Sequence, residues 1–424
     1  MPHPFFKSTL LKNIFSLTLL QGVNYLLPLI TVPYLVRVLG PKGFGTVGFA
    51  LAFIQYFVLL TDYGFNLSAT KIIAVGKNDP EIISTTFSSV LFIKGIFLIL
   101  SFFLLFALAN LSPKIGLHSW VFYLTFLMVV GNAIFPIWLF QGLQEMGHIV
   151  WINILSKTIC TGAIFIFVKS PQHINIAAGL QALGFLIAGI LGLTLALKKF
   201  RIRIKYPGIQ TVRQHLLDGW PVFLSTASIS LYTNTNIVLL GFLSSEAQVG
   251  FYVAGEKIIK AVQGLIAPVS QAVYPHVNEL ASQSKEKAIR FLKKILRFLG
   301  STSLLLSCSI FFLAKPIVKI ILGDEFHATI SILKWMSPLP LIIAISNVLG
   351  IQTMLSFGMN KEFSRSILYS SIINLFLVIP FTVWLQAEGT AITLLITELF
   401  VVFCMWRQLT RNKIHLFGVL QNDF

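Results

Sequence analysis

Four lysines interrupt apolar stretches of the sequence in which a lipid-facing helix has no charge: Lys94, Lys157, Lys257 and Lys260. At the centre of a bilayer, each of these charges costs about 2.5–3.5 kcal/mol if its side chain faces lipid. A chain that keeps four such residues is expected to hold a wet, positively charged interior. The ligand that suits such an interior is an anion.

The stretch 248–275 is the most amphipathic part of the chain. Glu256, Lys260 and Gln263 follow one another at steps of four and three residues, so a helix places them in one polar stripe. The spacing of Glu256 and Lys260 also allows an ion pair along the helix. Two interpretations remain open: the stripe holds helices together through that ion pair, or it lines a cleft.

The other two lysines lie in contrasting sequence surroundings. Lys157 shares a helical face with Asn153, and Lys94 lies near the middle of a long apolar run. Either lysine can instead reach the membrane surface or pair with a carboxylate. Asp62 and Glu398 are the candidate partners, and both are also candidate proton-carrying groups.

Other polar side chains extend this candidate site. Arg37 lies near the end of the first apolar run, where it is either an interface anchor or part of the same positive surface. Tyr232, Asn234 and Asn236 carry hydroxyl and amide groups that suit a hydroxylated substrate such as a sugar.

Several common chemistries have no support in the sequence. The stretch 43–48 matches the dinucleotide-binding pattern G-x-G-x-x-G, but a bilayer-length apolar run precedes it instead of a short strand. The eight histidines fall in predicted loops or near predicted helix ends, and the three cysteines are far apart. We therefore expect no metal site and no cofactor.

The elements that must position these residues are membrane helices. Of the 424 residues, 56% are hydrophobic and 11% are charged, against about 25% charged in a soluble domain. Apolar runs near the bilayer-spanning length of about 20 residues recur along the whole chain. They predict an all-α membrane protein with twelve helices, at 13–35, 44–62, 83–109, 117–140, 149–169, 175–197, 217–241, 248–275, 289–313, 330–357, 364–385 and 388–408.

The distribution of positive charge predicts the orientation. If both termini are cytoplasmic, most of the 32 lysines and arginines fall on the cytoplasmic side, as the positive-inside rule requires. The net charge of +17 is then a consequence of topology and of attraction to anionic lipid headgroups. It does not indicate nucleic-acid binding.

A weak internal repeat divides the chain in two. Val-Gly-Phe-Ala at 47–50 recurs as Val-Gly-Phe-Tyr at 249–252, and the predicted helices follow the same spacing in both halves. An even number of helices per half implies a pseudo-two-fold axis along the membrane normal. The expected parts are an N-lobe at 1–197, a basic cytoplasmic linker at 198–216, a C-lobe at 217–408 and a cytoplasmic tail at 409–424. We further expect the four lysines to face one cavity between the lobes.

Six stretches, spread in order over nearly the whole chain, resemble the signatures of Wzx-type polysaccharide flippases. They are VPYLVRVLGP at 32–41, GTVGFA at 45–50, DYGFNLSAT at 62–70, PIWLFQGL at 136–143, YVAGEK at 252–257 and PLPLIIAISNVLGIQ at 338–352. The resemblance implies membership of the multidrug/oligosaccharidyl-lipid/polysaccharide exporter superfamily and its two-lobe, twelve-helix fold.

The resemblance also implies a function. It suggests a protein of the bacterial inner membrane that flips undecaprenyl-diphosphate-linked repeat units of O-antigen or a similar surface polysaccharide by alternating access. The implied partners are the lipid-linked oligosaccharide, membrane lipid, and a polysaccharide polymerase with its chain-length regulator. In this picture the lysines bind the diphosphate, while Asn153, Tyr232, Asn234 and Asn236 contact sugars. Asp62, Glu256 and Glu398 are the candidates for coupling to an ion.

Two other functions compete with this one. A lipid II or drug exporter of the same superfamily shares the fold, although a cationic drug favours an acidic cavity and lysines outnumber the intramembrane carboxylates here. A membrane glycosyltransferase or polymerase commonly needs a large extramembrane loop, and the longest such segments predicted here have only about 20 residues. We therefore expect a transporter, not an enzyme.

Overall fold

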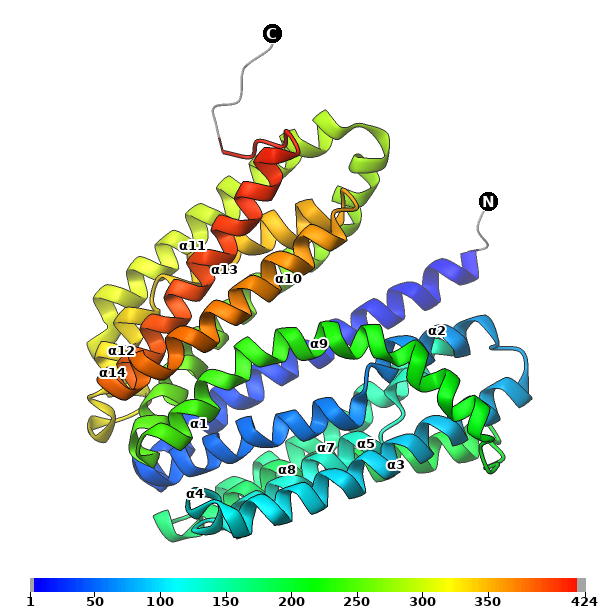
Figure 1. Ribbon diagram of the computed structural model, residues 1–424, viewed down its shortest axis with the longest axis horizontal. Helices are drawn as coiled ribbons and strands as arrows, with labels where there is room; N and C mark the ends of the chain where they lie inside the picture. Colours follow the sequence, from blue (N-terminus) through cyan, green and yellow to red (C-terminus); the bar gives the residue numbers. More distant parts are fainter. Residues whose placement is uncertain (1–3, 418–424) are drawn as a thin grey trace. The chain divides into compact units, whose positions relative to one another are not determined.

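The computed structural model describes the backbone of residues 4–417. Side chains are described there except at 4–21, 23–26, 228–229, 231–233, 267–268 and 271–272. Within these residues the regular structure is entirely helical (Figure 1). In the described part of the chain, eight stretches are long and apolar enough to cross a membrane.

Two of these helices are long enough for two crossings each, and both are kinked. Helix α1 (Pro4–Asp62) changes direction at Gly40, whose φ of 66° is accessible to glycine. Pro41 then begins the second half, because proline suits the first position of a helix. Helix α14 (Asn360–Arg411) is interrupted at Gln386, with φ 52°. Counting both halves, and the long helices α9 and α10, the described residues contain twelve bilayer-length segments.

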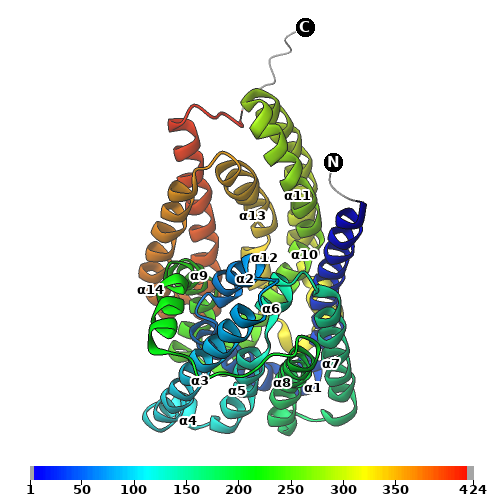
Figure 2. The ribbon, with the colours of Figure 1, turned by 90° about the vertical axis from the view of Figure 1, so that its right-hand side faces the viewer.

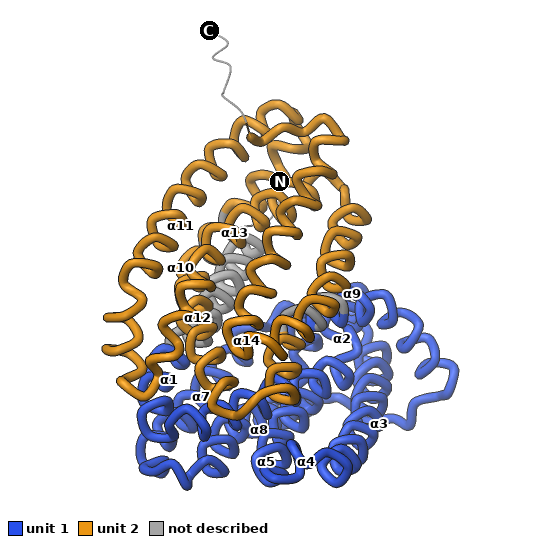
Figure 3. Tube along the Cα trace, turned by 60° about the vertical axis from the view of Figure 1, so that its left-hand side comes forward, with its two compact units in different colours: residues 1–230 blue, residues 231–424 orange. Residues whose placement is uncertain are grey.

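The chain forms two compact units, residues 1–230 and 231–424 (Figure 3). Unit 1 contains α1, α2 (Phe65–Val75), α3 (Pro80–Leu111), α4 (Pro113–Gly116), α5 (Ser119–Ile134), α6 (Ile137–Gly142), α7 (Met146–Phe167), the 3-10 turn η1 (Pro171–His173) and α8 (Ile174–Lys199). Helix α9 (Ile209–Leu243) begins in unit 1 and ends in unit 2.

Helices α5, α7 and α8 pack side by side and form one wall of unit 1 (Figure 2). Glycines allow the close approach of α5 to α8. A Cβ atom on Gly131 would lie 2.4 Å from the main-chain carbonyl of Phe185, and one on Gly189 would lie 2.5 Å from the Gly131 carbonyl oxygen. No side chain larger than hydrogen fits at either position without moving a backbone.

A tight turn at Tyr63 and Gly64 separates α1 from α2. Both residues have positive φ, 45° and 78°. The first part of α9 packs on this turn: the Tyr63 ring stacks on Phe223 with centroids 5.0 Å apart, and a Cβ atom on Gly64 would lie 2.7 Å from the Val222 side chain. The turn therefore fixes both the end of α1 and the start of α9 within unit 1.

Unit 2 contains the rest of α9, α10 (Glu246–Gln283), α11 (Lys285–Ile321), the 3-10 turn η2 (Asp324–Phe326), α12 (Thr329–Met336), α13 (Leu339–Asn347), the π-helix η3 (Val348–Leu355) and α14. Buried side chains of α10, α11, η3 and α14 form its core. Polar side chains join α10 to the α13–η3 segment: Ser270 donates to Asn347 at 2.5 Å, and Gln352 donates to Ser270 at 2.8 Å.

Candidate functional site

Each unit encloses a cavity of its own. The cavity of unit 1 has a volume of about 420 Å³. Its walls come from the second half of α1, the start of α2, helices α5, α7 and α8, and the part of α9 that belongs to unit 1. Polar side chains contribute much of the lining, namely Gln55, Thr61, Asp62, Asn66, Asn132, Asn153, Lys157, Thr226 and Ser230.

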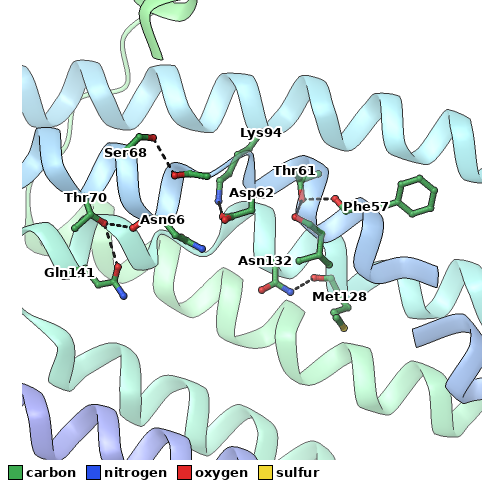
Figure 4. Close-up of polar contacts among 12 residues, drawn as sticks. Phe57, Thr61, Asp62, Asn66, Ser68, Thr70, Lys94, Met128, Asn132 and Gln141 are labelled. Atoms are coloured by element: carbon green, nitrogen blue, oxygen red, sulfur yellow. Dashed lines mark hydrogen bonds and ion pairs between the residues drawn. The ribbon is translucent and has the colours of Figure 1, made fainter. Parts of the chain in front are cut away.

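The carboxylate that lines this cavity, Asp62, is paired with a lysine that lies outside the lining. Asp62, the last residue of α1, accepts a hydrogen bond from the Lys94 ammonium at 3.2 Å (Figure 4). The Lys94 side chain is 3% exposed and that of Asp62 is 27% exposed. Lys94 does not line the cavity. Its charge is thus offset by an ion pair, one of the two alternatives that the sequence left open.

Lys157 is the one cation that lines the described part of this cavity. Its ammonium lies 4.5 Å from the centre of the Phe185 ring, which also lines the cavity. An aromatic face attracts a cation but does not neutralise it. Asp62 is paired with Lys94, so Lys157 is the residue that brings a positive charge to the described lining, and such surroundings suit an anion.

Three asparagines supply hydrogen-bonding groups. Asn132 and Asn153 donate their amide groups to main-chain carbonyls one turn earlier, at 2.8 and 3.1 Å. This arrangement leaves their amide oxygens to accept hydrogen bonds. The amide oxygen of Asn66 is buried and has no partner among the described residues. A ligand rich in hydroxyl groups satisfies such acceptors.

The cavity of unit 2 is smaller and more apolar, with a volume of about 290 Å³. Side chains from α10, α12, α13, η3 and α14 form its walls. Ten of them are apolar: Ile259, Met336, Leu339, Ile343, Ile351, Phe363, Ile367, Leu394, Val401 and Met405.

Among the described residues, the charged ones that line the unit 2 cavity are Glu256, Lys260 and Glu398. Glu256 and Lys260 form an ion pair of 2.9 Å along α10. All three members of the predicted stripe, Glu256, Lys260 and Gln263, line this cavity. Glu398 is 6% exposed and has no ion pair or hydrogen bond with any residue that the structure describes.

The remaining predicted residues lie outside both cavities. Lys257 is half-buried on α10, Arg37 is exposed on α1, and Asn234 and Asn236 lie on α9. The side chain of Tyr232 lies outside the described residues. Lys157 and Lys260 line separate cavities, each within its own unit, and the gathering of all four lysines in one cavity stays a prediction.

Sequence reasoning missed several residues that line the unit 1 cavity. Asn132 is one that the sequence could have revealed, because it interrupts an apolar run as the lysines do. Asn66 lies within the motif at 62–70, and nothing in that motif distinguishes it as a cavity residue. Thr226 lines the cavity because the first part of α9 packs on the turn at Tyr63. No sequence pattern indicates that contact.

Comparison with solved structures shows the fold. The fold is similar to that of the lipid II flippase MurJ in an inward closed conformation, with a TM-score of 0.73 and 15% identity over 95% of this chain and 87% of that one. It is also similar to an inward-facing multidrug resistance MATE family transporter, with a TM-score of 0.69 and 16% identity over 95% of this chain and 98% of that one. The predicted multi-pass, all-α membrane fold is confirmed.

Sequence comparison shows the family. Residues 10–281 match the polysaccharide biosynthesis protein family, to which the chain belongs. It is 36% identical to an Escherichia coli (strain K12) protein over 96% of this chain and 98% of that protein. A Shigella dysenteriae protein is 32% identical over 93% of this chain and 98% of that protein. Both relatives bear the name "Putative O-antigen transporter". The resemblance to Wzx-type flippases is thereby confirmed.

Proposed function

We propose that this protein is a flippase that moves undecaprenyl-diphosphate-linked oligosaccharide repeat units, of O-antigen or a similar surface polysaccharide, across the bacterial inner membrane by alternating access. The observation that carries this proposal is the unit 1 cavity, where Lys157 supplies a positive charge among amide side chains. The names of the two relatives support the same substrate class.

The chemistry of the unit 1 cavity fits both polar parts of such a substrate. The Lys157 ammonium can form a charge-assisted hydrogen bond with a diphosphate oxygen, which is stronger than a bond between neutral groups. The amide oxygens of Asn66, Asn132 and Asn153 can accept hydrogen bonds from sugar hydroxyls. Phe135 and Phe185, which also line the cavity, offer apolar faces against which sugar rings can pack.

The same features disfavour the competing functions. A cationic drug would meet the positive charge of Lys157, so a drug exporter is the weaker proposal. A lipid II exporter handles a substrate of the same diphosphate chemistry, but the likeness to such a protein at 15% identity shows the fold alone. Both relatives bear the name of a transporter, which supports transport over glycosyl transfer.

The role implies an orientation and partners. Both termini are cytoplasmic in this proposal, because that orientation places most lysines and arginines on the cytoplasmic side. A polysaccharide polymerase and a chain-length regulator act on the flipped product. A reporter fused after Phe424 that is active only in the periplasm would overturn the orientation.

The test is complementation of a strain that lacks the gene and makes no surface polysaccharide. Lys157→Ala removes the one cation that lines the described cavity and is expected to abolish polysaccharide at normal protein levels. Lys157→Arg is expected to restore part of it, since it keeps the charge but changes the donor geometry. The control is Lys77→Ala, an exposed residue between α2 and α3. Normal polysaccharide with Lys157→Ala would refute the proposed site.

A further inference from the structure

The structure distinguishes among the three carboxylates considered for ion coupling. Asp62 is paired with Lys94 at 3.2 Å, and Glu256 is paired with Lys260 at 2.9 Å. Glu398 is as deeply buried as Glu256, at 6% exposure for each residue, yet no ion pair or hydrogen bond reaches it from the described part of the chain. Glu398 is therefore the carboxyl group whose charge is left uncompensated.

The surroundings of Glu398 do not favour the ionised form. The side chain faces the unit 2 cavity, where Ile343, Leu394 and Val401 are among the apolar neighbours. The charged groups that face the same cavity are Glu256 and Lys260 of α10, and they neutralise each other. The lining residues from α12, α13, η3 and the first half of α14 bring no charged or titratable group. A buried carboxyl group without a partner takes up a proton instead of keeping its charge.

A metal cation fits this cavity poorly. Hard cations such as Ca²⁺ and Mg²⁺ take about six to eight oxygen ligands, whereas most of the lining here is apolar. The amide oxygen of Asn347 already accepts a hydrogen bond from Ser270 at 2.5 Å. A proton needs no coordination sphere, and a single carboxylate oxygen binds it.

We propose that Glu398 is a proton-binding site in unit 2, separate from the substrate cavity of unit 1, and that binding and release of this proton drive the transport cycle. The step is the addition of one proton from water to the Glu398 carboxylate, which gives the neutral carboxylic acid, and its reversal. The protonated cavity carries no net charge, and the deprotonated cavity carries one negative charge. The coupling to transport rests on the proposed function, whereas proton binding at Glu398 does not.

The direct test is infrared difference spectroscopy of the purified full chain in lipid nanodiscs. A protonated carboxyl group has a carbonyl stretching band that an ionised one lacks. Near neutral pH the wild type is expected to show this band, Glu398→Gln to lose it and Glu398→Asp to keep one. The control is Glu388→Gln, a half-buried residue of α14 that lines neither cavity. A wild-type spectrum identical to that of Glu398→Gln at every pH, or a band abolished by Na⁺, would overturn the assignment.

The coupling is tested by reconstitution into liposomes with a lipid-linked oligosaccharide. A pH gradient is expected to accelerate transport by the wild type and by Glu388→Gln, and an equal Na⁺ gradient is not. Glu398→Gln is expected to lose the response to the pH gradient. A full response in Glu398→Gln would refute the role of Glu398. If the wild type moved no oligosaccharide, the proposed function would fail, while the infrared band would still decide proton binding.

Discussion

The cavities of the two units differ in the sign of the ionisable group that each presents in addition to an ion pair. In unit 1 the carboxylate of Asp62 is paired with Lys94, and the further ionisable group in the described lining is the cation Lys157. In unit 2 the cation Lys260 is cancelled by Glu256, and the carboxyl group of Glu398 remains. Each cavity therefore has at least one member of an ion pair in its lining together with one further ionisable group, and these further groups have opposite signs. The lesson is that the ionisable group outside the ion pair, and not the number of charges, indicates which ligand a cavity suits.

Neutralising one carboxylate in each unit is expected to give the largest difference in folding stability between variants of the two units. Asp62→Asn leaves the buried Lys94 ammonium without its partner, which costs about 3–5 kcal/mol of folding free energy. Glu398→Gln replaces an unpaired group by a neutral one of similar shape and is expected to leave stability unchanged or raised. Thermal unfolding of the purified variants in detergent measures both effects.

A double variant serves as the control for that prediction. In Asp62→Asn with Lys94→Met, no charge remains buried, so much of the lost stability is expected to return. If Asp62→Asn alone were as stable as the wild type, the Lys94 charge would have another way to be compensated. The contrast between the two units would then lose its basis.

Glycine substitutions are expected to have an intermediate effect on folding stability, and this effect also differs between the units. In Gly131→Ala the new methyl group would lie 2.4 Å from the Phe185 main chain, so α5 and α8 must separate at a cost of about 1–3 kcal/mol. The shift would also move the ring beneath Lys157. In unit 2, Gly255→Ala meets its nearest neighbour at 3.4 Å, an ordinary contact. It is expected to be neutral or stabilising, because alanine favours a helix.

Unfolding midpoints of Gly131→Ala and Gly255→Ala, together with the surface polysaccharide made by each, check this prediction. Equal stability of the two variants would show that α5 and α8 can separate without cost. The polysaccharide assay then tells whether the position of Phe185 matters for transport.

The sequence indicated most of the elements, since twelve bilayer-length runs agree with twelve long helical segments among the described residues. It also indicated Lys157 and Glu398, because an ionisable group in an apolar run is visible without a structure. It did not determine which lysines are paired. Asp62 and Lys94 are 32 residues apart and meet only because α1 ends beside α3. The role of Thr226 depends on the packing of α9, which local sequence does not encode.

The smallest expected effect is a dependence of stability on pH at the start of α9. Burial lowers the pKa of His215 below its ordinary value of 6.5, partly offset by Asp218, which raises it. The unfolded chain then binds a proton more readily than the folded one, so stability is complete above pH 6.5 and falls as the pH drops below that value. His215→Gln is expected to flatten this part of the unfolding profile. A slope identical to that of the wild type would assign the dependence to other groups.

The central claim is that the anionic end of the substrate binds in the cavity of unit 1. The most direct measurement is equilibrium binding of an undecaprenyl-diphosphate-linked oligosaccharide to the purified wild type, Lys157→Ala and Lys260→Ala. Loss of a charge-assisted hydrogen bond is expected to weaken binding by Lys157→Ala about 10–100-fold. Lys260→Ala is expected to weaken binding far less, because its charge is held by Glu256. Equal affinity of Lys157→Ala and the wild type, or a larger loss in Lys260→Ala, would contradict the account.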